Sequence, residues 1–275
     1  MLRTVLYICL GLAIVVPMPA QAGPAEDCDQ DKDQDLKIKA CTTMIRREPR
    51  NHGHYVERGN AYFNKSDYPP AIADYTRAIE INPKDEVPFH NRCAAYNQSN
   101  QAERALPDCT RAIAINPKDQ VAYNNRCHSH ILLGRYDSAI ADCRRSVALK
   151  PDYGRSWRNM CNALVKKGDL DTAIAECSKG VAAAPKEGWL YFHRANAYFQ
   201  RSELDKALGD ADRANILETD EIEILALRGR IHEQQGNREK AIADYRTALK
   251  LDAGDGADRD AQRMALDRLT ELDKR

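Results

Sequence analysis

The sequence predicts an all-α protein, a solenoid built from helix–turn–helix repeats with a further helix covering its C-terminal end. Three observations predict it. Prolines recur at one fixed interval, alanine and bulky residues recur at fixed places within that interval, and the apolar residues follow helical spacing. The period, roughly 34 residues, is typical of stacked helical hairpins, in which each unit buries its apolar face against its neighbours.

The prolines set the register of the units. Pro49, Pro83, Pro117, Pro151 and Pro185 are evenly spaced, and their spacing is the length of one unit. Proline ends the helix that precedes it, so we place it at position 32, after the second helix of each unit. Thr219 and Ala253 replace it in the last two units. The resulting units 1 to 6 are residues 52–85, 86–119, 120–153, 154–187, 188–221 and 222–255.

Other positions define the two helices and the turn between them. Position 4 is bulky and position 20 is alanine in all six units, while position 27 is always small. A small residue lets two helix axes approach closely. Glycine and asparagine at position 15 indicate the left-handed residue that ends a helix. The position-15 residues are Ser66, Asn100, Gly134, Gly168, Ser202 and Gly236.

These six in-register units resemble the tetratricopeptide repeat family. The resemblance covers residues 52–255 and implies a right-handed superhelical solenoid whose first helices line a concave groove. Residues 23–51 are expected to form an N-terminal segment with a truncated unit, and residues 256–275 a C-terminal capping helix. The family binds proteins, so the resemblance implies an interaction scaffold for a protein or peptide.

Residues 1–22 resemble a cleavable secretory signal peptide. Arg3 precedes an apolar run that ends in small residues at Ala20 and Ala22. The run is too short to span a bilayer comfortably. We therefore expect a secreted or periplasmic protein whose mature chain begins at Gly23, with no membrane insertion after cleavage. A retained membrane anchor is the alternative.

The cysteines follow the repeat register. Cys9 leaves with the signal peptide, and every unit with cysteine at position 8 also has cysteine at position 24. The helix spacing brings facing Cα atoms to roughly 3.4–5.4 Å, which overlaps the span of about 4.4–6.8 Å that a disulfide needs. We predict disulfides Cys93–Cys109, Cys127–Cys143, Cys161–Cys177 and, by elimination, Cys28–Cys41.

Composition and motifs argue against several functions. Basic and acidic residues number 41 each, so nucleic-acid binding is not favoured, although an acidic partner for the arginines of the middle units stays open. A calcium loop at Asp29–Asp31–Asp33 fails, because Gln34 and Ala40 occupy its glycine and glutamate positions. No nucleotide-binding or catalytic motif occurs. We expect no enzyme activity, no cofactor and no metal.

The expected groove is rich in asparagine. In the family, positions 2, 5, 6, 9, 12 and 13 of the first helix face the groove. Asparagine is a poor helix former, but its amide can pair with the backbone of an extended peptide. We therefore expect alanine variants to lose binding without losing stability. The predicted peptide-binding residues are Asn60, Asn91, Asn124, Asn125, Arg158, Asn159, Asn162 and Asn196.

The leading prediction is thus an exported scaffold that binds an extended partner in its concave groove. The first alternative is an architectural protein of the cell envelope without a peptide groove. A sugar-binding protein or an enzyme using the scattered His and Asn residues is the second.

Overall fold

The computed structural model describes residues 24–254 and 256–274, and this part of the chain is entirely α-helical, with fifteen helices and no strand. The predicted signal peptide lies outside it. Each of the six units holds two helices. The first helices are α3 (His52–Asn64), α5 (Val87–Gln98), α7 (Gln120–Leu132), α9 (Gly154–Lys167), α11 (Gly188–Gln200) and α13 (Ile222–Gln234).

The second helix of each unit packs antiparallel to the first. These helices are α4 (Tyr68–Ile81), α6 (Ala102–Ile115), α8 (Tyr136–Leu149), α10 (Leu170–Ala183), α12 (Leu204–Leu217) and α14 (Arg238–Ala248). The chain starts with α1 (Pro24–Asp29) and α2 (Gln34–Arg47) and closes with α15 (Gly256–Asp273). None of these described helices is both long and apolar enough to cross a membrane.

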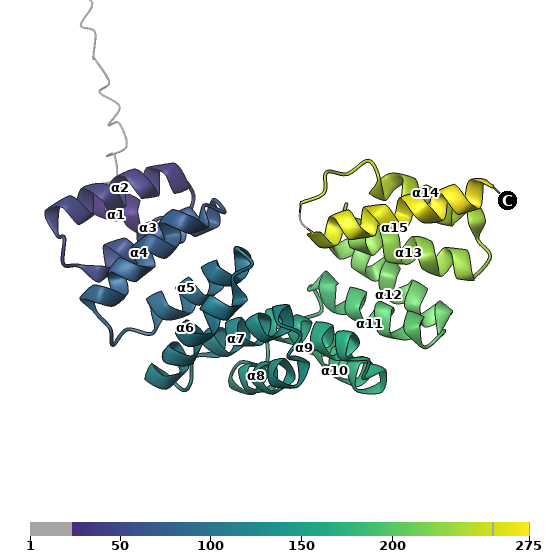
Figure 1. Ribbon diagram of the computed structural model, residues 1–275, viewed down its shortest axis with the longest axis horizontal. Helices are drawn as coiled ribbons and strands as arrows, with labels where there is room; N and C mark the ends of the chain where they lie inside the picture. Colours follow the sequence, from purple (N-terminus) through teal and green to yellow (C-terminus); the bar gives the residue numbers. More distant parts are fainter. Residues whose placement is uncertain (1–23, 255, 275) are drawn as a thin grey trace, which may run out of the picture.

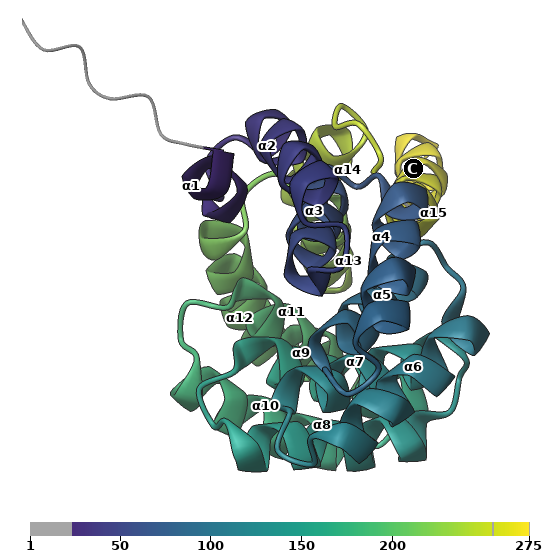
Figure 2. The ribbon, with the colours of Figure 1, turned by 90° about the vertical axis from the view of Figure 1, so that its left-hand side faces the viewer.

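The units follow one another in an arch (Figure 1). The second helices α6, α8 and α10 lie along its outer side, and the N-terminal and C-terminal units form its two arms. Turned by 90°, the same stack winds out of the plane, so the arch is part of a superhelix (Figure 2). The predicted all-α solenoid is confirmed, and the first helices α5, α7, α9 and α11 also contact one another along the stack.

The turn inside each unit has the predicted geometry. All six position-15 residues have positive φ, from 56° at Asn100 to 83° at Gly168. Because this left-handed conformation ends the first helix, the chain reverses at once into the second. Asp220 also has a positive φ of 62°, next to Thr219, one of the two residues that replace the expected proline.

Small residues hold the two helices of each unit close together. The position-20 alanines are fully buried in all six units. At position 27 of unit 4, a Cβ on Gly180 would come within 2.9 Å of the Cβ of Trp157. A larger residue there would therefore push the helices apart, which explains why the sequence keeps position 27 small.

Four disulfides occur within helix pairs, as predicted. They are Cys28–Cys41, Cys93–Cys109, Cys127–Cys143 and Cys161–Cys177, with Cα–Cα distances of 4.8, 5.5, 5.6 and 5.5 Å. Units 1 and 6 fill the same space with a tyrosine ring on a glycine. A Cβ on Gly59 would lie 2.7 Å from Cε1 of Tyr75, which explains why glycine and tyrosine change together with the cysteines.

A buried ion pair repeats in the same register, and it was not predicted from the sequence. Arginine at position 7 makes two hydrogen bonds to aspartate at position 23 in five units; in unit 2, Arg92 binds Asp108 at 2.7 Å through two nitrogens. The third guanidinium nitrogen of Arg92 binds Thr76 of the preceding unit. Unit 4 has Met160 and Glu176 at these positions. Positions 7 and 23 thus change together in unit 4, as positions 8 and 24 do with the cysteines. This joint change could have indicated in the sequence that the two side chains are in contact.

The helices at the two ends pack against the adjacent units. Lys37 of α2 is buried and contacts Asp31 and Glu57, each at 2.7 Å. At the other end, α15 packs on α13 and α14 through the buried residues Ala265 and Leu272. Arg268 of α15 also pairs with Glu233 of α13. Each end of the stack is therefore joined to the solenoid by an ion pair as well as by apolar contacts.

Candidate functional site

The N-terminal arm contains a pocket of about 460 Å³, lined by residues of the first helices α3, α5, α7 and α9. Three of the predicted groove residues meet there: Asn60 of α3, Asn91 of α5 and Asn125 of α7. Phe63 and Tyr75 add aromatic surface, and Tyr153 and Arg155 border the pocket beside α9. The structure therefore brings together amides from three successive units, which are far apart in the sequence.

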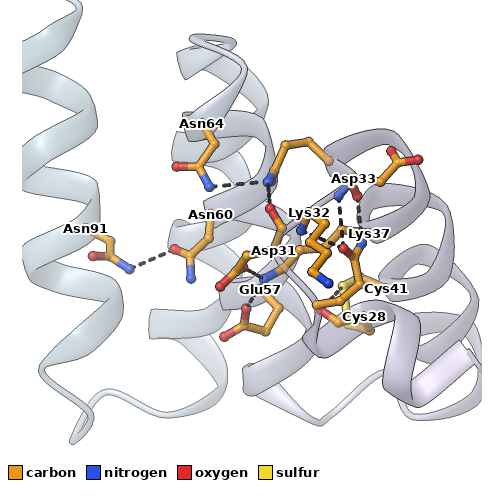
Figure 3. Close-up of polar contacts among 12 residues, drawn as sticks. Cys28, Asp31, Lys32, Asp33, Lys37, Cys41, Glu57, Asn60, Asn64 and Asn91 are labelled. Atoms are coloured by element: carbon orange, nitrogen blue, oxygen red, sulfur yellow. Dashed lines mark hydrogen bonds and ion pairs between the residues drawn. A yellow bond between two sulfur atoms is a disulfide. The ribbon is translucent and has the colours of Figure 1, made fainter.

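The amides of this pocket bond to one another across the units. Nδ2 of Asn91 donates to Oδ1 of Asn60 over 2.9 Å (Figure 3), and the Tyr75 hydroxyl donates to the same oxygen. Nδ2 of Asn125 donates to the backbone carbonyl of His90. Among the described residues, the Oδ1 atoms of Asn91 and Asn125 accept no hydrogen bond. The inner face thus retains acceptors for a ligand although its amides also tie consecutive units together.

Two other predicted groove residues are buried between units 3 and 4. Nδ2 of Asn159 donates to Oδ1 of Asn124 over 3.0 Å, and the Ser156 hydroxyl donates to the same oxygen. Ser156 in turn bonds to Ser146 of α8 over 2.6 Å. This buried network joins α7, α8 and α9. Asn124 and Asn159 therefore stabilise the interface between the units. The sequence predicted that alanine variants of the groove residues keep their stability; for these two residues we now expect a loss of stability.

The remaining predicted residues lie on α9 and α11. Arg158 pairs with Glu187 over 3.4 Å, and Asn196 accepts a hydrogen bond from Gln200. Asn162 is half-buried and makes no hydrogen bond within the described residues. The structure thus separates the eight predicted residues into a cluster in the N-terminal pocket, a buried pair, and a group on α9 and α11.

The N-terminal helices border the pocket through a polar network (Figure 3). Asp31, which lines the pocket, binds the ammonium of Lys37. Burial alone would lower the pKa of Lys37, but its hydrogen bonds to Asp31 and Glu57 raise it above the ordinary value. Lys37 is therefore charged, and it holds Asp31 in place at the edge of the pocket. A lysine within a helix gave no signal of this burial in the sequence.

The C-terminal arm has a different, more apolar surface. A second pocket, of about 340 Å³, lies among α11, α13 and α15 and is lined by Phe192, Leu227 and Met264. Trp189 and Phe192 contact each other edge to face at 5.2 Å. The guanidinium of Arg230 lies 4.6 Å from the centroid of the Phe199 ring. The inner face therefore changes from amide-rich to aromatic along the stack.

Within the residues that the structure describes, no group of three His, Cys, Asp or Glu side chains is placed to hold a metal ion. The eight cysteines of this part are all in disulfides. The pockets combine amides, aromatic rings and isolated charges. Such a surface can donate and accept hydrogen bonds along a bound chain and pack against its side chains.

Known structures with this fold are numerous. A tetratricopeptide repeat protein from Parabacteroides merdae ATCC 43184 is 21% identical, with 85% of this chain and 93% of that chain covered and a TM-score of 0.69. PilF of Pseudomonas aeruginosa is 16% identical, with 78% and 99% covered and a TM-score of 0.63. YrrB, described as having an unusual peptide-binding site, is 19% identical, with 71% and 97% covered and a TM-score of 0.50. At these identities the likeness concerns the fold.

Sequence comparison identifies the repeats directly. No curated protein matches the chain. Profiles described as tetratricopeptide repeat match residues 55–85, 130–190 and 222–255. These ranges fall in units 1, 3 to 5, and 6, in register with the helix pairs of the structure. Together with the helix pairs, the cysteine pairs within them and the neighbouring structures, these matches show that the chain belongs to the tetratricopeptide repeat family.

Proposed function

We propose that this protein is an exported scaffold that binds an extended segment of a partner protein along its concave inner face. The observation that carries the proposal is the N-terminal pocket, where amides from three successive first helices line one cavity. An extended chain presents carbonyl and amide groups at regular intervals, and amide side chains can pair with both. The tetratricopeptide fold supports an interaction scaffold, and one neighbour of the same fold is described as having a peptide-binding site.

Export is the second part of the proposal. Four disulfides are typical of proteins that fold in an oxidising compartment. The signal-like residues 1–22 agree with this. N-terminal sequencing of protein recovered from the compartment outside the cytoplasmic membrane should give Gly23. An intact Met1 on protein released only by detergent would contradict export in a soluble form.

Peptide binding is tested by selecting from a display library of random peptides on the purified, oxidised protein. A pocket variant, Phe63→Ala with Arg155→Ser, changes two residues that line the pocket and leaves the amide hydrogen bonds between units in place. A matched control, Ile216→Ala with Arg144→Ser, changes two exposed residues outside the pocket. We expect selected peptides to bind the pocket variant at least tenfold more weakly and the control as tightly as the original.

Equal binding to both variants would remove the pocket from the proposal. A selection that enriches no peptide would favour the architectural alternative, in which the groove holds no peptide. A glycan array probed with the same three proteins addresses the sugar-binding alternative, and dependence of glycan binding on Phe63 and Arg155 would replace the peptide proposal.

A further inference from the structure

The outer side of the arch carries a row of basic residues, one from each of five successive units. On each second helix, positions 22, 26 and 29 lie opposite the buried positions 20, 24 and 27, so they face away from the first helices. Position 26 is basic in units 1 to 5, with Arg77, Arg111, Arg145, Lys179 and Arg213. In unit 3, Arg144 stands next to this row and adds a second exposed cation.

At the centre of the row the cations have no carboxylate partner. Arg111 of α6 and Arg144 and Arg145 of α8 are exposed, and none of them forms an ion pair or a hydrogen bond within the described residues. In unit 1, by contrast, Arg77 pairs with Glu80 over 2.8 Å. The charges of the three central arginines are therefore available to a partner.

The acidic residues of α6 and α8 are all paired within the fold. The buried aspartates at position 23 bind the position-7 arginines. Position 18 carries Glu103 and Asp137, and each pairs with a cation of the next unit, Arg135 at 3.0 Å and Lys167 at 2.5 Å. Asp152, in the turn after α8, is an exposed carboxylate outside these pairs. It does not balance three arginines, so the outer side of the middle units has an excess of positive charge.

The shape of this surface suits a flat partner. Helices α6, α8 and α10 reach the same level along the outer side of the arch in both views (Figure 1, Figure 2). The longer side chains of Arg111 and Arg145 stand among small exposed residues, so they can reach a flat surface together. Such small residues provide no walls to hold an extended chain. They occupy positions 22 and 29 and are Pro107, Ala114, Ala141, Ala148, Ala175 and Ala182.

We propose that the outer side of units 2 to 4 binds the surface of a membrane that contains anionic phospholipids. Guanidinium groups form paired hydrogen bonds to phosphate oxygens, and the negative potential of such a surface attracts basic residues. The first helices lie on the other side of the second helices, so the inner face points away from the membrane and stays open to a partner. The inference concerns the opposite face from the proposed function and does not depend on it.

The test measures binding of the purified, oxidised protein to vesicles by co-flotation. One kind of vesicle contains equal parts of phosphatidylglycerol and phosphatidylcholine, and the other contains phosphatidylcholine alone. We expect the protein to bind the anionic vesicles only. Binding should weaken as the salt concentration rises, because salt screens the attraction between the arginines and the phosphates.

A triple variant shows whether the central arginines make this contact. Each basic residue near an anionic surface strengthens binding about fivefold, so removing three should weaken it about a hundredfold. The variant combines Arg111→Gln, Arg144→Gln and Arg145→Gln. A matched control removes three exposed cations of α2 and should bind like the parent. It combines Lys39→Gln, Arg46→Gln and Arg47→Gln. Because all six residues are exposed, both proteins should melt close to the parent's melting temperature.

Equal binding to the two kinds of vesicle would overturn the inference, since an apolar segment such as residues 1–22 binds without regard to lipid charge. Unchanged binding of the arginine variant would also overturn it. Polyglutamate is the probe for an acidic polypeptide as the partner. If polyglutamate binds and anionic vesicles do not, the outer side belongs to such a polypeptide and the membrane assignment is wrong. None of these results affects peptides selected on the inner face, so the proposed function is tested separately.

Discussion

Oδ1 of Asn124 accepts a hydrogen bond from Nδ2 of Asn159, 3.0 Å away, and both side chains are buried between units 3 and 4. The two residues belong to the same asparagine series that the sequence assigned to ligand binding. Their burial shows that one residue type serves two purposes along the inner face. Between units 3 and 4 the amides are buried and bonded to each other. In the N-terminal pocket Asn91 and Asn125 also bond across units, but within the described residues their Oδ1 atoms accept no hydrogen bond.

This pairing makes a prediction about stability. Asn159→Ala should lower the free energy of unfolding by about 1–3 kcal/mol, because it removes a buried hydrogen bond and leaves Oδ1 of Asn124 with one donor fewer. Asn162→Ala, one helical turn later, should be neutral or slightly stabilising, since alanine is the better helix former. Urea unfolding of both variants measures the difference. Equal stability of the two would contradict the structural role of Asn159.

The buried ion pairs make a second prediction. Arg92→Met should destabilise the protein by about 3–5 kcal/mol, because the carboxylate of Asp108 would remain buried without its partner. The double variant Arg92→Met with Asp108→Glu has the same residues at positions 7 and 23 as unit 4. It tests whether the Met–Glu combination restores part of the lost free energy of unfolding. Thermal unfolding is the measurement. A loss of less than about 1 kcal/mol in the single variant would show that the carboxylate is hydrated and the pair dispensable.

Two glycines in helices give a matched pair of substitutions. Gly59→Ala should be destabilising, because the new Cβ would lie 2.7 Å from the Tyr75 ring, which is packed against the glycine. Gly209→Ala, in α12, has nothing within 4 Å of the new Cβ and should stabilise the protein by about 0.5–1 kcal/mol. Calorimetry of both variants tests the geometry of the tyrosine–glycine contact. A stabilised Gly59→Ala variant would contradict it.

The disulfides give a fourth prediction. Each bridge closes a short loop, so reduction should lower the melting temperature by removing about 3 kcal/mol per bridge in the chain-entropy estimate. Units 1, 5 and 6 contain no cysteine and should keep their helices. Circular dichroism with and without reductant follows both effects. Peptide mapping of the unreduced protein should find only pairs within helix hairpins; a bridge between different units would contradict the register.

The sequence was sufficient to predict the repeat register, the left-handed turns and the cysteine pairs, because each depends on positions that recur once in every unit. The use of each groove asparagine could not be predicted this way. Asn91 and Asn159 occupy the same position of their units, yet one lines a pocket and the other is buried. That difference depends on how closely successive first helices pack, which involves contacts between units. The burial of Lys37 likewise depends on the short helix α1 and its loop, which lie outside the regular repeat.

His193 makes a prediction about pH. Burial, with a contribution from the Arg158 and Lys166 cations, lowers the pKa of His193 to about 3, well below the ordinary value of 6.5. Between these two values the unfolded chain takes up a proton at this residue and the folded protein does not. The corresponding stability is therefore fully present above about pH 6.5 and is lost as the pH falls toward 3, with a slope that approaches about 1.4 kcal/mol per pH unit for one group.

A variant that cannot titrate isolates this contribution. His193→Gln should lose free energy of unfolding less steeply than the parent when both are measured in urea at pH 7, 6, 5 and 4. The difference between the two curves belongs to His193, because the other titrating groups are common to both proteins. Parallel curves would show that the imidazole of His193 is protonated as readily in the folded protein as in the unfolded chain, and hence that it is open to water.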